Sequence, residues 1–419
     1  MIGKRIRYYR KLRGHTLESL SEGICSVSYL SKIEHGDKSS EEIISFLCDR
    51  LGIKYSDVDN SEEMERINIL LNKWYKAILD YEDRTSLEKK QHIIKIALEE
   101  SKIEEPLLYL KFDLFRLRFQ FFLGDMQDAE NTLKYINKFK DIFNEELNFY
   151  YLQFSGIYHN FMNDFPKANE CFKEAEEILT KLEHSETEEA QLYYQMANLY
   201  ARFTQVAESL KYAEKALQVF NKDYNLTRIA DCQVLLGIGN RLNNNLNKAE
   251  HHYEQALKFV KILDDPQRLA IIHHNLGHVK SQRGLSEEAI SHYHLGLKYS
   301  NDDSRAMINY LLALEYYKLK QMNQCLTHID EGFPLSKNMI DKEYYFSFLV
   351  LRHKATNQKD RNYELLIKNE VIPYFTKIQR WDQVAEFAEE LAEHYYDLKA
   401  YKKASEMYKI SIDAMKKMR

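Results

Sequence analysis

The stretch GIGNRLNNNLNKAEHHYEQA, residues 237–256, places small and aromatic residues at fixed intervals. Gly237 is followed by Ala249, Tyr253 and Ala256, at offsets of 12, 16 and 19 residues. The last three share one face of a helix, because residues three and four apart are neighbours on a helical surface. Small residues let two helices approach closely, and the ring fills the remaining gap. The stretch therefore predicts a pair of closely packed helices.

The same pattern recurs along most of the chain. The clear copies are Gly156, Ala168, Phe172 and Ala175; Ala197, Ser209, Ala213 and Ala216; Gly277, Ala289, Tyr293 and Gly296; and Ala392, Ala404, Tyr408 and Ser411. Weaker copies start at Leu117 and Ala313, and residues 343–375 are expected to hold a pair of unknown phase. The pattern resembles the tetratricopeptide repeat, with intervals longer than its usual period of about 34 residues. This resemblance implies an array of helix pairs that coils into a right-handed superhelix with a concave inner face.

Composition supports an all-α chain and excludes several classes. The 419 residues include only 13 Gly and 5 Pro, which is too few for a turn-rich β-sandwich, a collagen or a Pro-rich disordered chain. The net charge of −5 gives no general basic surface, so any nucleic-acid contact must be local. Five cysteines without a CxxC pair argue against a disulfide framework. With no signal peptide and no long apolar run, we expect a cytoplasmic protein that does not contact a membrane.

The first 55 residues differ from the rest. The segments TLESLSEGI (16–24), VSYLSKIEHG (27–36) and SSEEIISFLCDRLGI (39–53) predict three short helices that follow a basic first helix. In the last segment Ile43, Phe46, Leu47 and Leu51 are expected to face inward. The stretch LSEGICSVSYLSKIEHG (20–36) resembles the helix-turn-helix of the lambda-repressor-like Xre family. The expected fold is therefore all-α, with a helix-turn-helix domain followed by tetratricopeptide repeats.

The helix-turn-helix resemblance implies binding to double-stranded DNA. The recognition helix of such a domain enters the major groove with its N-terminal side chains at base edges. The residues expected to contact DNA bases or phosphates are Arg5, Thr16, Ser26, Val27, Ser28, Tyr29 and Lys32. Residues 1–16 hold six basic side chains and no acidic one, which fits either a DNA contact or a solvated helix face. Tyr29 fits either a DNA contact or packing onto the domain.

The order of the two parts carries a second resemblance. An Xre-type domain followed by repeats of about 40 residues is similar to the Rap/Rgg/NprR/PlcR/PrgX group of peptide-pheromone regulators, and most similar to its NprR-type members. We therefore place a DNA-binding domain at residues 1–56, a linker at 57–70, and a peptide-binding and oligomerisation domain at 71–419. The resemblance implies a transcription regulator switched by an imported peptide of about 5–10 residues. Ordering such a peptide costs roughly 1–2 kcal/mol per residue, which its contacts must offset.

The inner face of the repeats is where this peptide is expected. Counting each small anchor as position 8 of the first helix, positions 2, 5, 6, 9, 12 and 13 face the groove. The residues selected for peptide binding are Arg118, Asn160, Gln195, Asn198, Arg202, Arg241, His274, Asn275, His278, Gln282, Tyr310 and Tyr317. Amides suit a peptide backbone because each offers a donor and an acceptor. Asn198 and Asn275 are the foremost backbone ligands by the resemblance, with Arg202 for a carboxylate. Solvated groove residues are the alternative.

The last repeat carries acidic residues at helical spacing. Glu389 and Glu393 are expected either to receive a lysine or free amine of the peptide, or to form a solvated acidic face. His274 and His278 are four residues apart, but no nearby Cys or acid completes a metal site. No catalytic motif is found. We expect no metal, no cofactor and no enzymatic activity.

Two functions remain open at this point. The first is a peptide-switched regulator that binds a palindromic operator as a homodimer or homotetramer, because a single small domain contacts too little DNA for typical specificity. Whether it activates or represses does not follow from the residues. The alternative is a protein that binds and inhibits a response regulator of the sporulation phosphorelay in its peptide-free state, as Rap-type and NprR-type members do. The only glutamine near the region that a Rap-type phosphatase would use is Gln91.

Overall fold

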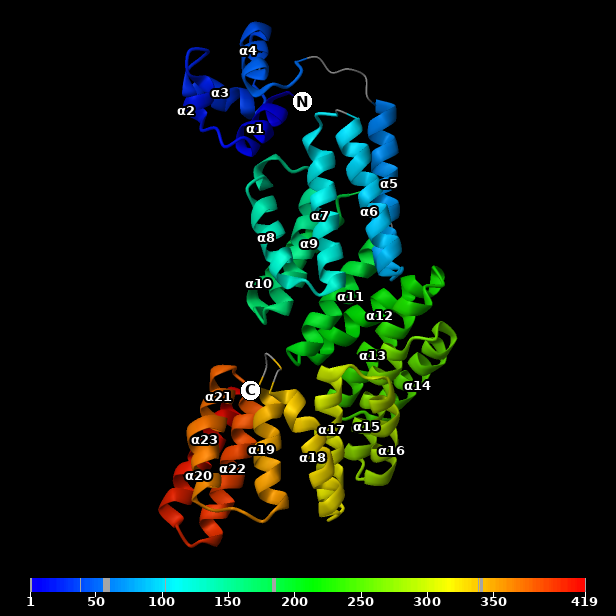
Figure 1. Ribbon diagram of the computed structural model, residues 1–419, viewed down its shortest axis with the longest axis vertical. Coiled ribbons are helices and arrows are strands. Elements are labelled where there is room, and N and C mark those ends of the chain that lie inside the picture. Colours follow the sequence, from blue (N-terminus) through cyan, green and yellow to red (C-terminus); the bar gives the residue numbers. More distant parts are fainter. Residues whose placement is uncertain are drawn as a thin grey trace. The chain divides into compact units, whose positions relative to one another are not determined.

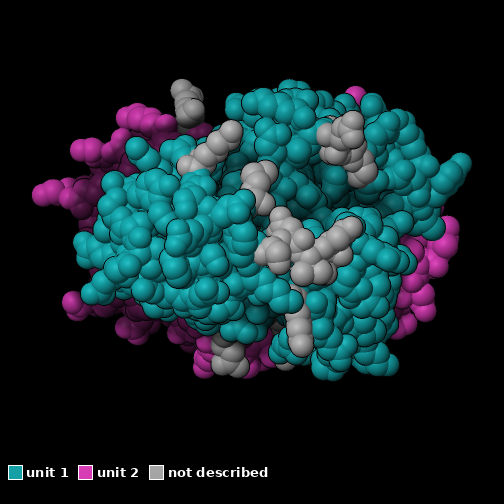
Figure 2. All heavy atoms as spheres, turned by 90° about the horizontal axis from the view of Figure 1, so that it is seen from above, with its two compact units in different colours: residues 1–239 teal, residues 240–419 magenta. Residues whose placement is uncertain are grey.

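The computed structural model describes residues 2–418 except 38, 56–60, 102, 183–185, 338, 340 and 341, and describes no side chains at 302 and 303. Within these residues all regular structure is helical. The chain divides into two compact units, residues 1–239 and 240–419, which Figure 2 colours separately. No helix in the described residues is long and apolar enough to span a membrane.

Unit 1 begins with a small four-helix domain. Its helices are α1 (Ile2–Leu12), α2 (Leu17–Ser21), α3 (Val27–Glu34) and α4 (Glu41–Leu51). Side-chain oxygens of Thr16, Ser26 and Ser40 accept backbone N–H groups at the starts of α2, α3 and α4, which satisfies donors that a helix leaves unpaired. Gly36, just after the end of α3, has a φ of +99°, a conformation that favours glycine.

One expectation for α4 is wrong. Phe46 is 51% exposed, whereas Ile44 is buried with Leu47, Cys48 and Leu51. The buried stripe thus runs through residues 44, 47, 48 and 51, which are spaced three and four apart on one helical face. The expected set of residues (43, 46, 47 and 51) and the buried set both have helical spacing. The contacts of α4 with α1 and α2 therefore decide which set is buried.

The remainder of unit 1 is a series of antiparallel helix pairs (Figure 1). They are α5 (Ser61–Leu79) with α6 (Arg84–Glu100), α7 (Pro106–Leu123) with α8 (Met126–Asn137), α9 (Glu145–Phe161) with α10 (Phe165–Leu179), and α11 (Glu186–Arg202) with α12 (Val206–Lys222). A short 3₁₀ helix, η1 (Lys140–Ile142), follows α8, and unit 1 ends within α13 (Leu226–Leu242). Of the expected linker, 57–60 lie outside the described residues and 61–70 belong to α5.

The repeat anchors meet as their spacing predicts. A Cβ added to Gly156 on α9 would lie 2.4 Å from the Phe172 ring on α10, so only glycine permits this approach. In the next pair, the Ser209 hydroxyl on α12 donates to the Ala197 carbonyl on α11 at 3.0 Å. Close contact between small residues therefore sets the geometry of each pair.

Unit 2 continues the pairs. They are α14 (Leu246–Leu263), α15 (Pro266–Gln282) with α16 (Ser286–Tyr299), α17 (Asp302–Lys318) with α18 (Met322–Ser336), and α22 (Trp381–Asp397) with α23 (Tyr401–Lys417). Between them α19 (Glu343–Ala355) is followed by α20 (Arg361–Leu366), the π-helical turn η2 (Ile367–Val371) and α21 (Ile372–Lys377). The wider π turn shifts the register of the helix, which is why the repeat at residues 343–375 had no readable phase.

Candidate functional sites

The first turn of α3 presents an exposed polar surface. Ser26 caps the helix by accepting the backbone N–H of Tyr29 at 3.2 Å, and its hydroxyl lies 3.2 Å from that of Ser28. Val27 is 40% exposed, and Ser28 and Lys32 are also exposed. Ser26, Val27, Ser28 and Lys32, selected for DNA contact, therefore lie together on the accessible side of this helix. This is the surface that a recognition helix offers to the major groove.

The other three residues selected for DNA contact are placed differently. Thr16 is exposed at the start of α2, where its hydroxyl accepts the N–H of Ser19 at 3.0 Å. Tyr29 is half-buried against the core of the domain. Arg5 is only 9% exposed, and its guanidinium donates to the Lys54 carbonyl at 3.3 Å, because Arg5 lies on the inward face of α1.

An ion pair that the sequence analysis missed holds α3 against α1. The Arg10 guanidinium donates to both carboxylate oxygens of Glu34, at 2.5 and 2.8 Å, and both side chains are buried. Two-point contact between an arginine and a carboxylate fixes direction as well as distance. This pair therefore sets the orientation of α3 within the domain.

In unit 1, three residues selected for peptide binding form one network. The Asn160 amide on α9 donates to the Asn198 side-chain oxygen on α11 at 3.3 Å. Arg202 donates to the Asn160 carbonyl at 2.7 Å and to the Asn163 side chain at 2.6 Å. Asn198 is half-buried, as is Gln195 one turn before it, and Arg202 is exposed. Two neighbouring first helices thus place amides and a guanidinium together.

Arg118 lies deeper in unit 1. It is 8% exposed, and burial lowers the pKa of its guanidinium, as does the positive charge of the nearby Arg228. Arg228 is fully buried, with its guanidinium 5.1 and 4.7 Å from the ring centres of Tyr81 and Tyr194. The sequence analysis missed Arg228, since it lies outside the counted repeat positions. The Arg228 guanidinium also pairs with the Asp231 carboxylate at 3.4 Å, so part of this positive charge is balanced inside unit 1.

In unit 2, Arg241, His274 and His278 gather in one place. The two imidazole ring centres are 4.7 Å apart. Burial is the main reason that the pKa of His278 is lowered to about 4 and that of His274 falls well below its usual value. The Arg241 charge contributes to both shifts, and His278 contributes to that of His274. Asn275 is used inside the protein: its amide donates to the Ile271 carbonyl at 2.9 Å and its oxygen accepts from the Tyr253 hydroxyl at 3.4 Å. Its side chain thus packs between helices.

The last residues selected for peptide binding are more scattered. Gln282, Glu389 and Glu393 are exposed, and Tyr310 and Tyr317 are half-buried. The neighbouring Glu390 lies within a contact network that the selected acids do not join. It accepts from the Tyr363 hydroxyl and, at 3.0 Å, from the Lys354 ammonium. Lys354 lies 5.6 Å from the centre of the Tyr317 ring, which links this network to a selected residue.

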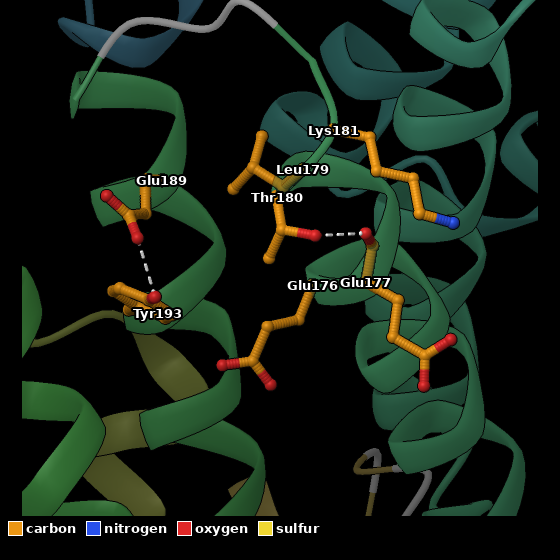
Figure 3. Close-up of a pocket in the computed structure, with 7 residues that line it drawn as sticks. All are labelled: Glu176, Glu177, Leu179, Thr180, Lys181, Glu189 and Tyr193. Atoms are coloured by element: carbon orange, nitrogen blue, oxygen red, sulfur yellow. Dashed lines mark hydrogen bonds between the residues drawn. The ribbon is translucent and has the colours of Figure 1, made fainter.

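A separate pocket of about 440 Å³ lies at the end of α10 and the start of α11 (Figure 3). Its lining residues are Glu176, Glu177, Leu179, Thr180, Lys181, Glu189 and Tyr193. The Tyr193 hydroxyl donates to Glu189 at 2.6 Å, and Glu176 accepts from the Tyr212 hydroxyl at 3.2 Å. None of the residues selected for peptide binding lines this pocket. Among the described residues, no group of three or more His, Cys, Asp or Glu is placed to hold a metal ion.

Comparison with known proteins decides the family. A helix-turn-helix family model matches residues 6–58, and a tetratricopeptide repeat model matches residues 188–262. The transcriptional activator NprA of Geobacillus stearothermophilus is 33% identical over 409 residues, covering 95% of this chain and 99% of the activator. The chain belongs to the Rap/Rgg/NprR/PlcR/PrgX family. The expected order of a helix-turn-helix domain before tetratricopeptide repeats is confirmed.

Solved structures of this family share the fold. A Rap protein complexed with the competence and sporulation factor has a TM-score of 0.74 at 22% identity, covering 84% of this chain and 99% of that one. NprR in complex with its cognate peptide NprX has a TM-score of 0.67 at 21% identity, covering 86% of this chain and all of that one. At these identities the likeness concerns the fold, and the site residues rest on the geometry described above.

Proposed function

We propose that this chain is a transcription regulator that binds operator DNA through α3 and is switched by a short peptide held on the first helices of its repeats. The observation that carries the proposal is the exposed polar first turn of α3, in a chain similar along 95% of its length to a transcriptional activator. Its similarity to NprR bound to a peptide supports the second part. The same similarities favour a regulator that acts by binding rather than an enzyme.

The exposed side chains of α3 carry groups that can bind base edges. Ser28 and Lys32 carry a hydroxyl and an ammonium on the exposed side of α3, and Val27 adds an apolar group suited to a thymine methyl. Arg5 takes no part in this proposal while its guanidinium is bound to Lys54. A domain this small reads one half-site, so two copies on a palindromic operator are needed for typical specificity.

Lys32→Ala tests the DNA contact. Full-length protein is titrated with duplexes selected from a random pool by the unmodified chain. Loss of a base contact costs about 1–3 kcal/mol, so we expect a fall in affinity of at least about tenfold. Lys89→Ala, at an exposed lysine of α6, is the matched control and leaves affinity unchanged. Equal affinity of the Lys32 and Lys89 variants contradicts the proposed recognition surface.

The network of Asn160, Asn198 and Arg202 supports the proposed peptide contact. Amides on neighbouring first helices can pair with the N–H and C=O groups of an extended peptide. Their present bonds to one another keep these polar groups satisfied until a peptide replaces them. Arg118, in the same unit as this network, adds positive charge for a peptide carboxylate.

A synthetic heptapeptide pool tests this contact. Peptides retained by the full chain are identified by mass spectrometry, and the strongest is titrated by calorimetry. Asn198→Ala is expected to weaken it about tenfold, because a lost hydrogen bond to a buried partner costs about 1–3 kcal/mol. Asn221→Ala, at an exposed amide of α12, is the control. Retention of no peptide, or equal weakening by both changes, contradicts the proposal.

Replacing Glu389 and Glu393 together by glutamine tests whether the acidic face of α22 binds the peptide. If these exposed carboxylates receive a cationic group, the double change weakens a basic peptide more than a neutral one. Equal weakening assigns them to a solvated surface. A response regulator remains a second expected partner, and its retention on immobilised chain with and without peptide tests that role.

A further inference from the structure

The basic residues of α1 are divided between two faces. Arg5 and Arg10 turn into the helix-turn-helix domain, where they bind Lys54 and Glu34. Lys4, Arg7 and Lys11 lie three and four residues apart and so share the other face. This second face, which we call the seat face (Lys4, Arg7, Tyr8 and Lys11), contacts the repeats.

The seat face lies against the end of α8 and η1. The Lys11 ammonium donates to the Lys138 carbonyl at 2.8 Å and to the Asp141 carboxylate at 2.7 Å. Arg7 also pairs with Asp141, and Lys4 donates to the Ile142 carbonyl at 3.2 Å. Two cations thus share one carboxylate, and two lysines bind backbone carbonyls near the C-terminal end of α8, which is the negative end of a helix.

An apolar contact accompanies these charges. Tyr8 is 3% exposed and belongs to the core of the repeats, not to that of the small domain. Its ring centre lies 5.0 Å from that of Phe139. After α4, the Lys54 backbone N–H donates to the Glu104 carboxylate at 2.7 Å. The helix-turn-helix domain therefore contacts the repeats at two places, and the contact at Tyr8 is buried.

Helix α7 joins this contact to a peptide-binding candidate. It contacts α1 directly, and its Asp113 carboxylate lies close enough to Tyr8 to influence the Tyr8 hydroxyl. Arg118 lies on the same helix, five residues further on, or about 7.5 Å along the axis. A displacement of α7 at Arg118 would therefore be transmitted to the seat face through one rigid element.

We propose that the basic face of α1 is a seat that fixes the helix-turn-helix domain on α7, α8 and η1, and that it is not a DNA-contacting surface. The seat sets the orientation of the recognition helix, and in a dimer it sets the distance between two recognition helices. The contact of α1 with the repeats rests on the bonds described above. Its effect on operator binding rests on the proposed function. The exposed first turn of α3 takes no part in the seat, so DNA binds the seated domain.

Lysine acetylation of the full chain tests the contact without DNA or peptide. Reaction rates at Lys4 and Lys11 are compared with that of the exposed Lys89 by mass spectrometry. We expect Lys4 and Lys11 to react several-fold more slowly than Lys89, and Asp141→Arg to remove most of this protection. Asp128→Asn, an exposed carboxylate on α8, is the matched control and leaves the rates unchanged. Rates at Lys4 and Lys11 equal to that at Lys89 in the unmodified chain overturn the proposal.

Operator spacing tests the consequence. Duplexes selected by the unmodified chain are remade with the two half-sites moved apart in single base-pair steps. We expect the unmodified chain to bind one spacing several-fold better than its neighbours, and Asp141→Arg to flatten this preference while single half-site affinity is retained. An unchanged spacing preference in Asp141→Arg, or a single half-site affinity lowered by Lys11→Gln, overturns the seat. Absence of any duplex binding contradicts the proposed function instead, and acetylation still decides the contact.

Discussion

Glycine at position 277 lets α15 approach α16 until the Tyr293 ring occupies the space of a side chain. A Cβ at this position would lie 2.4 Å from the ring, which is shorter than any tolerated contact. The sequence predicted this pair correctly, because the interval of 16 residues between Gly277 and Tyr293 is repeated elsewhere in the chain. A helix contact that requires one residue type at a fixed interval can therefore be predicted from the sequence alone.

Gly277→Ala is expected to lower the free energy of unfolding by about 1–3 kcal/mol, the usual cost of overpacking a core. Hydrogen exchange of the α15 and α16 amides in the full chain measures this loss. Gly296→Ala is the matched control, since its Cβ would meet the flexible end of Ile308 at 3.3 Å and the Ala270 carbonyl at an ordinary contact distance of 3.4 Å. A Gly277 variant as stable as the Gly296 variant contradicts the packing described.

Charged residues were predicted less well than small ones. The sequence shows six basic residues among residues 1–16 but not their partners, because Glu34 and Asp141 lie far along the chain from Arg10 and Lys11. Arg5 was assigned to DNA and is instead bound to a carbonyl. Long-range ion pairs follow from tertiary contacts that no local pattern records.

Glu34→Gln is expected to destabilise the helix-turn-helix domain by about 3–5 kcal/mol, because it leaves the Arg10 charge buried without its partner. Faster hydrogen exchange in α1 and α3 is the measured result. Glu22→Gln replaces an exposed carboxylate of the same domain and serves as the control. Similar exchange in the two variants would show that the pair does not hold α3.

At the scale of elements, paired histidines join α15 to α16. The Nδ1 atoms of His273 and His292 are 3.2 Å apart, so one imidazole donates a hydrogen bond to the other. Burial lowers the pKa of His273 to about 4 and also lowers that of His292. Between about pH 4 and 6.5 the unfolded chain binds protons that the folded chain does not, so stability falls as the pH falls.

Acidification from pH 7 to pH 5 is therefore expected to cost the α15–α16 pair about 1–2 kcal/mol through His273. Hydrogen exchange, corrected for the intrinsic effect of pH, measures the opening free energy of these helices. His273→Gln is expected to remove the part of the pH dependence that His273 contributes, while His251→Gln, at an exposed histidine of α14, retains it. The part that remains belongs to His274, His278 and His292, whose pKa values are also lowered by burial. Stability that rises on acidification would contradict the described burial.

Helix pairs are predicted well where the repeat pattern is regular and poorly where the backbone departs from it. The pair α9 and α10 follows directly from the positions of Gly156 and Phe172. The second helix of the pair near residue 370 contains a π turn, which shifts the register of the residues that follow it in the same helix. In α4, two sets of apolar residues have helical spacing. Contacts with α1 and α2 bury Ile44 and leave Phe46 exposed.

At the scale of the whole molecule, the order of the two kinds of domain was predictable and their connection was not. Residues 20–36 and the repeated anchors each carry a specific pattern. The contact between α1 and η1 joins segments about 130 residues apart, and the sequence shows it only as a basic helix and an isolated Asp141. The peptide candidates lie in both compact units, and Asn160, Asn198 and Arg202 form the best-connected group.

The most direct test of the central claim is selection of duplexes by the full-length chain from a random pool, followed by sequencing. A regulator that reads DNA through the first turn of α3 is expected to enrich a two-fold symmetric motif, with half-sites about one or two helical turns apart. Simultaneous replacement of Ser28 and Lys32 by alanine is expected to abolish that enrichment. A selected pool no different from the starting pool, or an equal enrichment by the double variant, would contradict the account.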